Sequence, residues 1–210
     1  MTERATSTPA DPSSPDAPNP ADAAPARETP RLILRPHRSE DAPALAAICG
    51  RPEVARFLLD EPWTEEFAAT QVAERLPKTS LSGPAGALAV VIEHEGRVIG
   101  DAQLWLTDRE RGVAEIGWVL DPAFGGKGFA GEAAAHLLAL GFVEHGLHRI
   151  AAQMDARNTA SARLAERLGM TREAHLRQDW WSKGEWTDTV IFGMLASDLP
   201  EPQAEEPAHR

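Results

Sequence analysis

Residues 113–130, VAEIGWVLDPAFGGKGFA, decide the fold of this chain. The first eight residues are mostly apolar, with valine and isoleucine among them, and predict a strand over 113–120. Glycines dominate residues 125–128, and a helix is predicted from about 126 to 145. Its apolar residues recur at helical spacing: Ala130, Ala133, Ala134, Leu137, Leu138 and Phe142. A strand that leads through a glycine-rich loop into a long helix is therefore the centre of the fold.

The loop from Leu120 to Ala130 predicts an anion site. Glycines let the backbone approach a ligand closely, and free N–H groups at a helix start attract negative charge. Lys127 adds a positive charge, so a diphosphate is the natural ligand; a glycine-rich turn without a ligand is the alternative. The loop is neither a P-loop nor a dinucleotide fingerprint, because GxxxxGKS/T is absent and no GxGxxG follows a first strand.

The segments before this centre predict a strand, two helices and a hairpin. A strand is expected over 31–35, a helix from Ser39 to Cys49, and a second helix that begins at Thr64 and ends before Pro77. ALAVVIEH and RVIGDAQLWLTD predict two strands joined by a turn at Glu95-Gly96.

The segments after the centre return to strands. A strand is expected over 148–154, a short helix from Asn158 to Leu168 that stops at Gly169, and a last strand pair over 170–178 and 186–195. Together these elements predict an α+β sheet protein, with a hairpin meander first and strand–helix–strand units second.

The two ends differ from the rest in composition. Residues 1–30 hold seven of the 17 prolines and contain no Ile, Leu, Val, Phe or Trp, so they cannot bury enough apolar surface to offset their ordering entropy. We expect disordered tails over 1–30 and 201–210, and one folded domain over 31–200.

Composition excludes several function classes. The formal net charge of −11 argues against a general nucleic-acid binder, which carries a basic face. The single cysteine excludes an intramolecular disulfide and a cysteine-based zinc site, and the seven histidines show no ligand spacing, so no metal is predicted. The sequence has no run of 18 apolar residues, so no membrane span is predicted. The polar N-terminus lacks the apolar core of a signal peptide, so secretion is not expected. A cytoplasmic location is expected.

The order of these segments resembles the GNAT superfamily of acetyl-CoA-dependent N-acetyltransferases. More narrowly it resembles the RimJ/RimL-type branch, which includes acetyltransferases of ribosomal-protein N-termini. The matching segments span about 31–200: RLILRP, AEIGWVLDPAFGGKGFAGEA, NTASARLAERLGM and GEWTDTVIFGML. The resemblance implies a mixed sheet of about six to seven strands with about four helices, splayed between the strands at 113–120 and 148–154.

The resemblance also implies a cofactor site. The family loop reads Q/R-x-x-G-x-G/A, and its positions here are Gly125, Gly128 and Ala130. Gly125 departs from the pattern, which removes a long side chain from the phosphate rim. Backbone N–H groups would still hold the diphosphate of acetyl-CoA, the opened strand would pair with its pantetheine arm, and Asn158 would contact that arm. The implied cofactor-binding residues are Trp118, Val119, Leu120, Gly125, Gly126, Lys127, Gly128, Phe129, Ala130 and Asn158.

Amide formation from a thioester requires a neutral amine in attack geometry, a donor for the oxyanion and a proton for the departing thiolate. The family places a backbone N–H near Val119 or Leu120 for the oxyanion. Many members use a tyrosine as the acid at the position of Ala165, but the chain has no tyrosine, so that mechanism is excluded. Ser161 fills the slot that the Rim-type branch uses; the alternative is a small buried serine bonded to a carbonyl one turn back.

Glu115 is the predicted base. In strand alternation it shares a face with Val113, Gly117 and Val119, which leads toward the splay. The alternative is a solvated or ion-paired strand residue. Glu132 is a rival base, but its place after the loop favours a role in stabilising the helix start.

The remaining candidates have simpler interpretations. Asn158 is expected to cap its helix, with or without a cofactor contact, and Cys49 to lie in the core. Trp180, Trp181 and Trp186 either line an acceptor pocket or pack on the sheet edge.

The sequence therefore predicts an N-acetyltransferase that moves an acetyl group from acetyl-CoA to a primary amine by direct attack. A protein N-terminus is one acceptor hypothesis. A small-molecule amine, such as an aminoglycoside or polyamine, and a non-catalytic CoA-binding regulatory module are the alternatives. A monomer and a homodimer both remain open.

Overall fold

The computed structural model describes residues 26–199, so the tail predictions for 1–25 and 200–210 lie outside the described residues. The described part forms one nine-stranded sheet of order β1-β2-β4-β5-β6-β7-β9-β8, with β3 paired to β4. The strands are β1 Arg27–Glu28, β2 Ile33–Pro36, β3 Thr79–Ser80, β4 Ala87–His94, β5 Arg97–Asp108, β6 Val113–Leu120, β7 Arg149–Asp155, β8 Thr171–Ser182 and β9 Glu185–Leu195. The helices are α1 Ala42–Cys49, α2 Pro52–Ala55, α3 Glu65–Arg75, α4 Phe129–Ala139 and α5 Thr159–Arg167.

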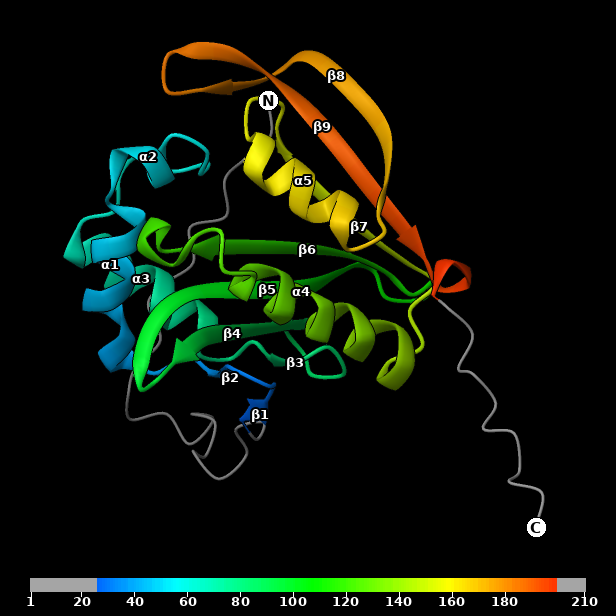
Figure 1. Ribbon diagram of the computed structural model, residues 1–210, viewed down its shortest axis with the longest axis horizontal. Helices are drawn as coiled ribbons and strands as arrows, with labels where there is room; N and C mark the ends of the chain where they lie inside the picture. Colours follow the sequence, from blue (N-terminus) through cyan, green and yellow to red (C-terminus); the bar gives the residue numbers. More distant parts are fainter. Residues whose placement is uncertain (1–25, 200–210) are drawn as a thin grey trace.

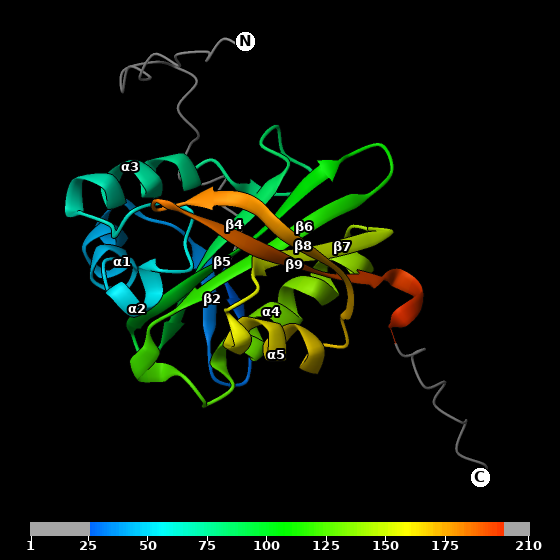
Figure 2. The same cartoon turned by 90° about the horizontal axis from the view of Figure 1, so that it is seen from above.

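Helices cover both faces of this sheet, as Figures 1 and 2 show. On one face, Leu104, Ile116 and Ile150 pack against Ala133 and Leu137 of α4 in the larger core. On the other face, α1 and α3 form a second core into which Val98 and Val119 point. Because successive residues of a strand point to opposite faces, β6 contributes Ile116 to the first core and Val119 to the second.

The sheet parts between β6 and β7. These strands are parallel neighbours, but they pair only over Val113–Glu115 with Arg149–Ala151. Beyond that point β6 stays paired with β5 and β7 stays paired with β9. The predicted splay is therefore confirmed, and it begins directly after Glu115.

The ordered domain begins earlier than the predicted boundary at residue 31. Arg27 pairs with Leu34 in the β1–β2 ladder, and the Thr29 hydroxyl donates to Glu132 at 2.6 Å. Backbone pairing with β2 and a side-chain hydrogen bond to Glu132 hold this segment in place. Its lack of apolar side chains therefore does not mark where the ordered part begins.

Most other elements follow the prediction, and the differences have local causes. The predicted bounds 87–94, 97–108 and 113–120 are confirmed. Helix α4 begins at Phe129 rather than 126, because Gly126 and Gly128 take positive φ angles of 74° and 84°. The chain then continues from α4 into a π-helical turn, Leu140–Glu144. Residues 26–199 contain nine strands and five α-helices, where about six to seven strands and about four helices were expected. The short elements β1, β3 and α2 show no periodic pattern in the sequence.

Candidate active site

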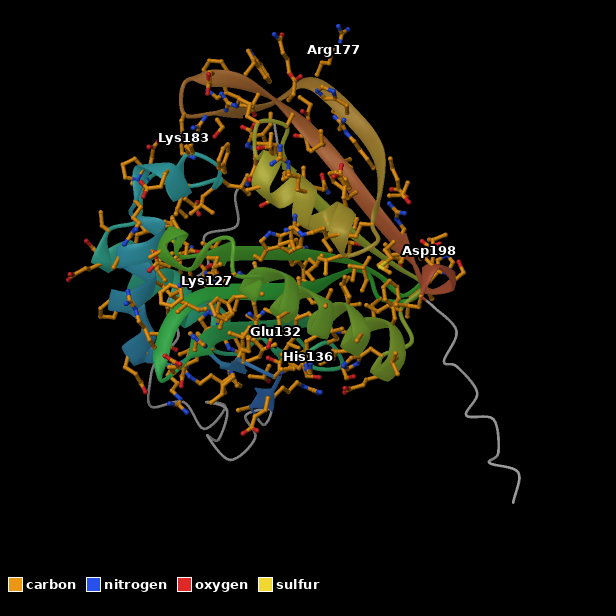
Figure 3. All side chains as sticks on the ribbon, in the orientation of Figure 1. Lys127, Glu132, His136, Arg177, Lys183 and Asp198 are labelled. Atoms are coloured by element: carbon orange, nitrogen blue, oxygen red, sulfur yellow. The ribbon has the colours of Figure 1, made fainter. Side chains whose placement is uncertain are left out.

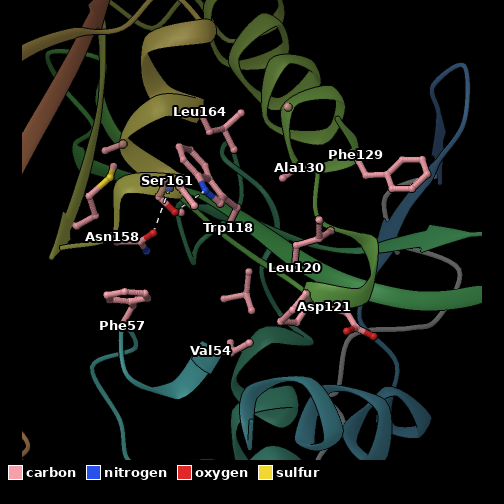
Figure 4. A pocket seen from close by; sticks show the side chains of 18 of the residues that line it. Val54, Phe57, Trp118, Leu120, Asp121, Phe129, Ala130, Asn158, Ser161 and Leu164 are labelled. Atoms are coloured by element: carbon pink, nitrogen blue, oxygen red, sulfur yellow. Dashed lines mark hydrogen bonds between the residues drawn. The ribbon is translucent and has the colours of Figure 1, made fainter. Parts of the chain in front are cut away.

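A cavity of about 630 Å³ occupies the gap where β6 and β7 part. Figure 4 shows it from close by, with α5 on one side and the chain around α2 on the other. Its wall comprises residues 116–121 of β6 and its end, 152–154 of β7, the loop and first turn of α4, one face of α5, and Glu53, Val54, Phe57 and Leu58. Segments far apart in the sequence therefore meet around one opening in the sheet.

The backbone of β6 presents polar groups to this gap. The Asp121 N–H donates to the Ile99 carbonyl at 2.7 Å, toward β5, and Val119 is opposite Asp101 in the same ladder. Since N–H and C=O directions alternate along a strand, Trp118 and Leu120 direct theirs toward the parted β7. Two backbone N–H groups were predicted as the oxyanion donor. The N–H of Leu120 faces the gap, and the N–H of Val119 faces β5.

The loop before α4 has the geometry of an anion site. Gly128 is the N-cap of α4 in the left-handed conformation, and the first helical bond runs from the Glu132 N–H to the Gly128 carbonyl at 3.0 Å. The N–H groups of the first turn therefore have no acceptor inside the helix. Gly125, Gly126, Gly128, Phe129 and Ala130 all line the cavity, whereas the buried Phe129 ring points into the core.

Two basic residues bracket this loop from outside the cavity. The Lys127 ammonium lies 5.3 Å from the centre of the Phe124 ring, and Figure 3 labels Lys127 near the start of α4. Arg31 donates to the Lys127 carbonyl at 2.8 Å and to Glu132 at 2.7 Å. Arg31 thus fastens the loop to the N-terminal segment.

Glu132 belongs to that fastening. Its carboxylate accepts from Thr29 and from the backbone and side chain of Arg31. Burial raises the pKa of Glu132, but the hydrogen bonds from Thr29 and Arg31 outweigh burial and lower the pKa below its ordinary value. A carboxylate bound in this way is a structural group at the helix start.

Asn158 and Ser161 lie together on the cavity wall. The Ser161 N–H donates to Asn158 Oδ1 at 3.1 Å, which confirms Asn158 as the N-cap of α5. The Trp118 indole donates to Ser161 Oγ at 3.3 Å, and Figure 4 shows both bonds. Because the hydroxyl accepts this bond, its own hydrogen is available for a group in the cavity.

Glu115 lies next to the cavity wall but does not line the cavity. Gln153 Nε2 donates to its carboxylate at 2.8 Å. Gln153 lines the cavity, and Glu115 is not among the lining residues. Glu115 is also the last residue of β6 that pairs with β7. Its carboxylate therefore reaches the cavity through Gln153 or through solvent.

The other candidates lie elsewhere. Cys49, the last residue of α1, is buried in the core that α1 and α3 form, where burial raises the pKa of its thiol to about 12. Trp180, Trp181 and Trp186 are about half exposed on the outer part of the β8–β9 hairpin. They are not among the residues that line the cavity. Within residues 26–199, no group of three metal-ligating side chains is present, and no helix there is long and apolar enough to cross a membrane.

The wall formed around α2 was not predicted from the sequence. The tip of the β8–β9 hairpin holds this wall, because the Lys183 ammonium donates to the carbonyls of Ala55, at 2.9 Å, and Leu58. Figure 3 shows Lys183 at the hairpin tip beside α2. Pro52 at the first helical position was the available signal, but four residues give no periodicity.

The chain is similar to several known proteins. Residues 31–171 match the acetyltransferase (GNAT) domain family. The uncharacterized N-acetyltransferase p20 of Bacillus licheniformis is 34% identical over 167 residues, 80% of this chain and 94% of that protein. A GNAT-family acetyltransferase from Bacillus anthracis superposes with a TM-score of 0.72 at 26% identity, over 82% of this chain and 99% of the other. The ribosomal-protein alpha-N-acetyltransferase RimL, solved with coenzyme A, has a TM-score of 0.70 at 20% identity, over 80% and 95%.

Proposed function

The chain belongs to the GNAT acetyltransferase family and is an acyltransferase that uses acetyl-CoA; from this premise we propose that its acceptor is a molecule with a single primary amine, foremost a protein or peptide N-terminus. The observation that carries the proposal is the parting of β6 from β7 after Glu115, with a cavity in the gap. One end of that cavity suits the donor, and the wall around α2 suits the acceptor.

The donor is held by backbone. The N–H groups at the start of α4 bind the diphosphate, because they lack helical acceptors and carry the positive end of the helix dipole. The edge of β6 pairs with the amides of the pantetheine arm through the N–H and carbonyl of Trp118 and the carbonyl of Leu120, as a neighbouring strand would. This arrangement brings the thioester close to Ser161 and Asn158.

The proposed chemistry is direct transfer. The neutral amine attacks the thioester carbonyl, and the Leu120 N–H stabilises the oxyanion. Collapse of this intermediate breaks the C–S bond. The Ser161 hydroxyl passes its proton to the departing thiolate and takes one back from solvent water. Glu115 accepts the proton that the amine loses, through a bridging water, and the amide of Gln153 holds the carboxylate in place.

The wall around α2 favours an acceptor with one ammonium group. Val54, Phe57, Leu58 and Met154 make this part of the cavity apolar. Its acids are Glu53 and Asp121, and the nearly buried Asp121 carboxylate is within 3.5 Å of both Arg51 and Arg97. A polyamine presents several ammonium groups and needs several carboxylates, whereas an N-terminus presents one. RimL, a protein of this fold, acts by its name on a ribosomal-protein N-terminus.

A panel of amines tests the proposal. Thiol release from acetyl-CoA would be measured with short peptides that begin with Ser or Ala, with the same peptides blocked at the N-terminus, and with spermidine and an aminoglycoside. We expect turnover with free peptides and none with blocked ones. Faster turnover with spermidine or the aminoglycoside would reassign the acceptor to a small molecule.

A further inference from the structure

A second cavity, of about 200 Å³, lies away from the parted strands. Residues of β1, β2, β3 and β4 form one side of it, at the β1 end of the sheet, and the π-helical turn after α4 forms the other. It shares no lining residue with the cavity between β6 and β7. The proposed transfer reaction therefore leaves this second cavity without a role.

The floor of the second cavity is apolar. Leu34, Leu88, Val90 and Leu140 line it, and each is at most 4% exposed. All four belong to the larger core, so a ligand on this floor would lie against the edge of that core. The volume equals that of about six or seven water molecules, which suits a small branched aliphatic group.

The rim of the second cavity carries one charge of each sign. The Arg27 guanidinium donates two hydrogen bonds to the Glu144 carboxylate, at 2.9 and 3.1 Å. The hydrogen bond from Arg27 lowers the pKa of Glu144, so the carboxylate is charged at neutral pH. The two side chains are 31% and 51% exposed, so a ligand can reach both. A guanidinium has five donors, and within residues 26–199 these bonds use two of them.

A charged pair beside an apolar floor favours a zwitterion with an aliphatic side chain. An anion alone is attracted by Arg27 and repelled by Glu144, and a cation alone meets the reverse, so the two effects nearly cancel. A zwitterion can place its carboxylate on the free donors of Arg27 and its ammonium on the outer lone pairs of Glu144. The four charges then alternate in sign, and no charged group loses its partner.

We propose that the second cavity binds a small α-amino acid with an aliphatic side chain, of the size of leucine or valine. Its carboxylate contacts Arg27, its ammonium contacts Glu144, and its side chain lies on the apolar floor. Because the charged contacts are partly exposed, each is weak, and we expect a Kd for leucine on the order of 1 mM. This binding is independent of the donor and the acceptor of the transfer reaction.

An NMR titration of the full chain with leucine tests the site. Backbone amide signals of Thr79, Ser80 and His145, which line the second cavity, should shift with leucine. Three analogues each lack one part of leucine: isocaproate lacks the ammonium, isoamylamine lacks the carboxylate, and glycine lacks the side chain. Each analogue should bind about fivefold more weakly than leucine or less tightly still.

Variants of the charged pair test its part in binding. Arg27→Gln and Glu144→Gln should each raise the Kd for leucine by about fivefold. Arg111→Gln is the matched control, because Arg111 forms an ion pair with Asp108 at 2.8 Å and does not line the second cavity. The amide spectrum of each variant without ligand shows whether it keeps the native fold.

Several results would overturn the proposal. One is that leucine, at about ten times the expected Kd, shifts no amide signal of the second cavity. Another is that isocaproate or isoamylamine binds as tightly as leucine. Shifts confined to the cavity between β6 and β7 would make leucine an acceptor analogue instead. A Kd that neither variant of the pair changes, or that Arg111→Gln changes equally, would remove Arg27 and Glu144 from the site.

Discussion

The indole of Trp118 donates a hydrogen bond to the hydroxyl of Ser161 across 3.3 Å. The bond connects β6 to α5 on the cavity wall, and it keeps the serine hydrogen from pointing toward the indole. An acid that must meet a sulfur atom benefits from such an orientation, because a rotating hydroxyl spends little time in the required direction.

Ser161→Ala should lower kcat by about 10²-fold while the affinity for acetyl-CoA stays nearly constant, because the thiolate would then leave without a proton donor. Steady-state kinetics together with a binding titration separate the two quantities. Trp118→Phe removes the orienting bond and keeps the hydroxyl, so its loss of kcat should be smaller. An unchanged kcat in Ser161→Ala would restrict Ser161 to packing.

Glu115→Gln should lower kcat by roughly 10²-fold at neutral pH if its carboxylate accepts the amine proton. For the native chain, kcat/KM should rise with pH, because only the neutral amine attacks. High pH should restore part of the variant's rate, since solvent then deprotonates the acceptor. Gln153→Ala keeps the carboxylate and removes its contact with the cavity. If both variants lose the same rate at every pH, Glu115 orients Gln153 and accepts no proton.

Gly128→Val should abolish the rise in melting temperature that coenzyme A produces through mass action. The residue has a φ of +84°, and a β-branched side chain there would obstruct the approach of the diphosphate. The strain itself costs about 1–3 kcal/mol, so a control is needed. Gly96→Val provides it, because Gly96 has a φ of +75° with no atom within 4 Å of its Cβ position. A ligand shift that survives in Gly128→Val would place the diphosphate elsewhere.

Glu132→Gln should lower the melting temperature at pH 7 by a few degrees. The pKa of Glu132 is lowered in the folded chain, so its contribution to stability is complete above the unfolded value near 4.5. That contribution is lost as the pH falls through the folded pKa. The difference between native chain and variant should therefore shrink in acid. Glu166→Gln, on the exposed side of α5, controls for the loss of one charge.

Local signals account for the parts that the sequence predicts well. Strand alternation and the Glu95-Gly96 turn locate β4 and β5, and the Asn158 cap locates α5. The start of α4 was missed by three residues, because the φ angles of Gly126 and Gly128 depend on their neighbours. Contacts between distant segments were not predictable at all. Lys183 reaches the carbonyls around α2 across more than 120 residues of chain.

The site residues divide in the same way. The resemblance indicated Asn158 and Ser161, and the structure brings both to the cavity. Alternation assigned Glu115 to the same face as Val119. Its distance from the cavity depends on the residue at which β7 departs, which no pattern within β6 records.

Because β6 and β7 pair over only three residues, the sheet is divided at this point into two parts. Strands β1 to β6 form one half-sheet, strands β7 to β9 form the other, and the crossover through α4 is their covalent link. Backbone amides at the end of β6 that face the gap should exchange hydrogen with solvent quickly in the empty protein and slowly once a ligand occupies the seam. If the proposed pairing with β6 holds, the cosubstrate acts as a temporary strand that enters and leaves the sheet with each turnover.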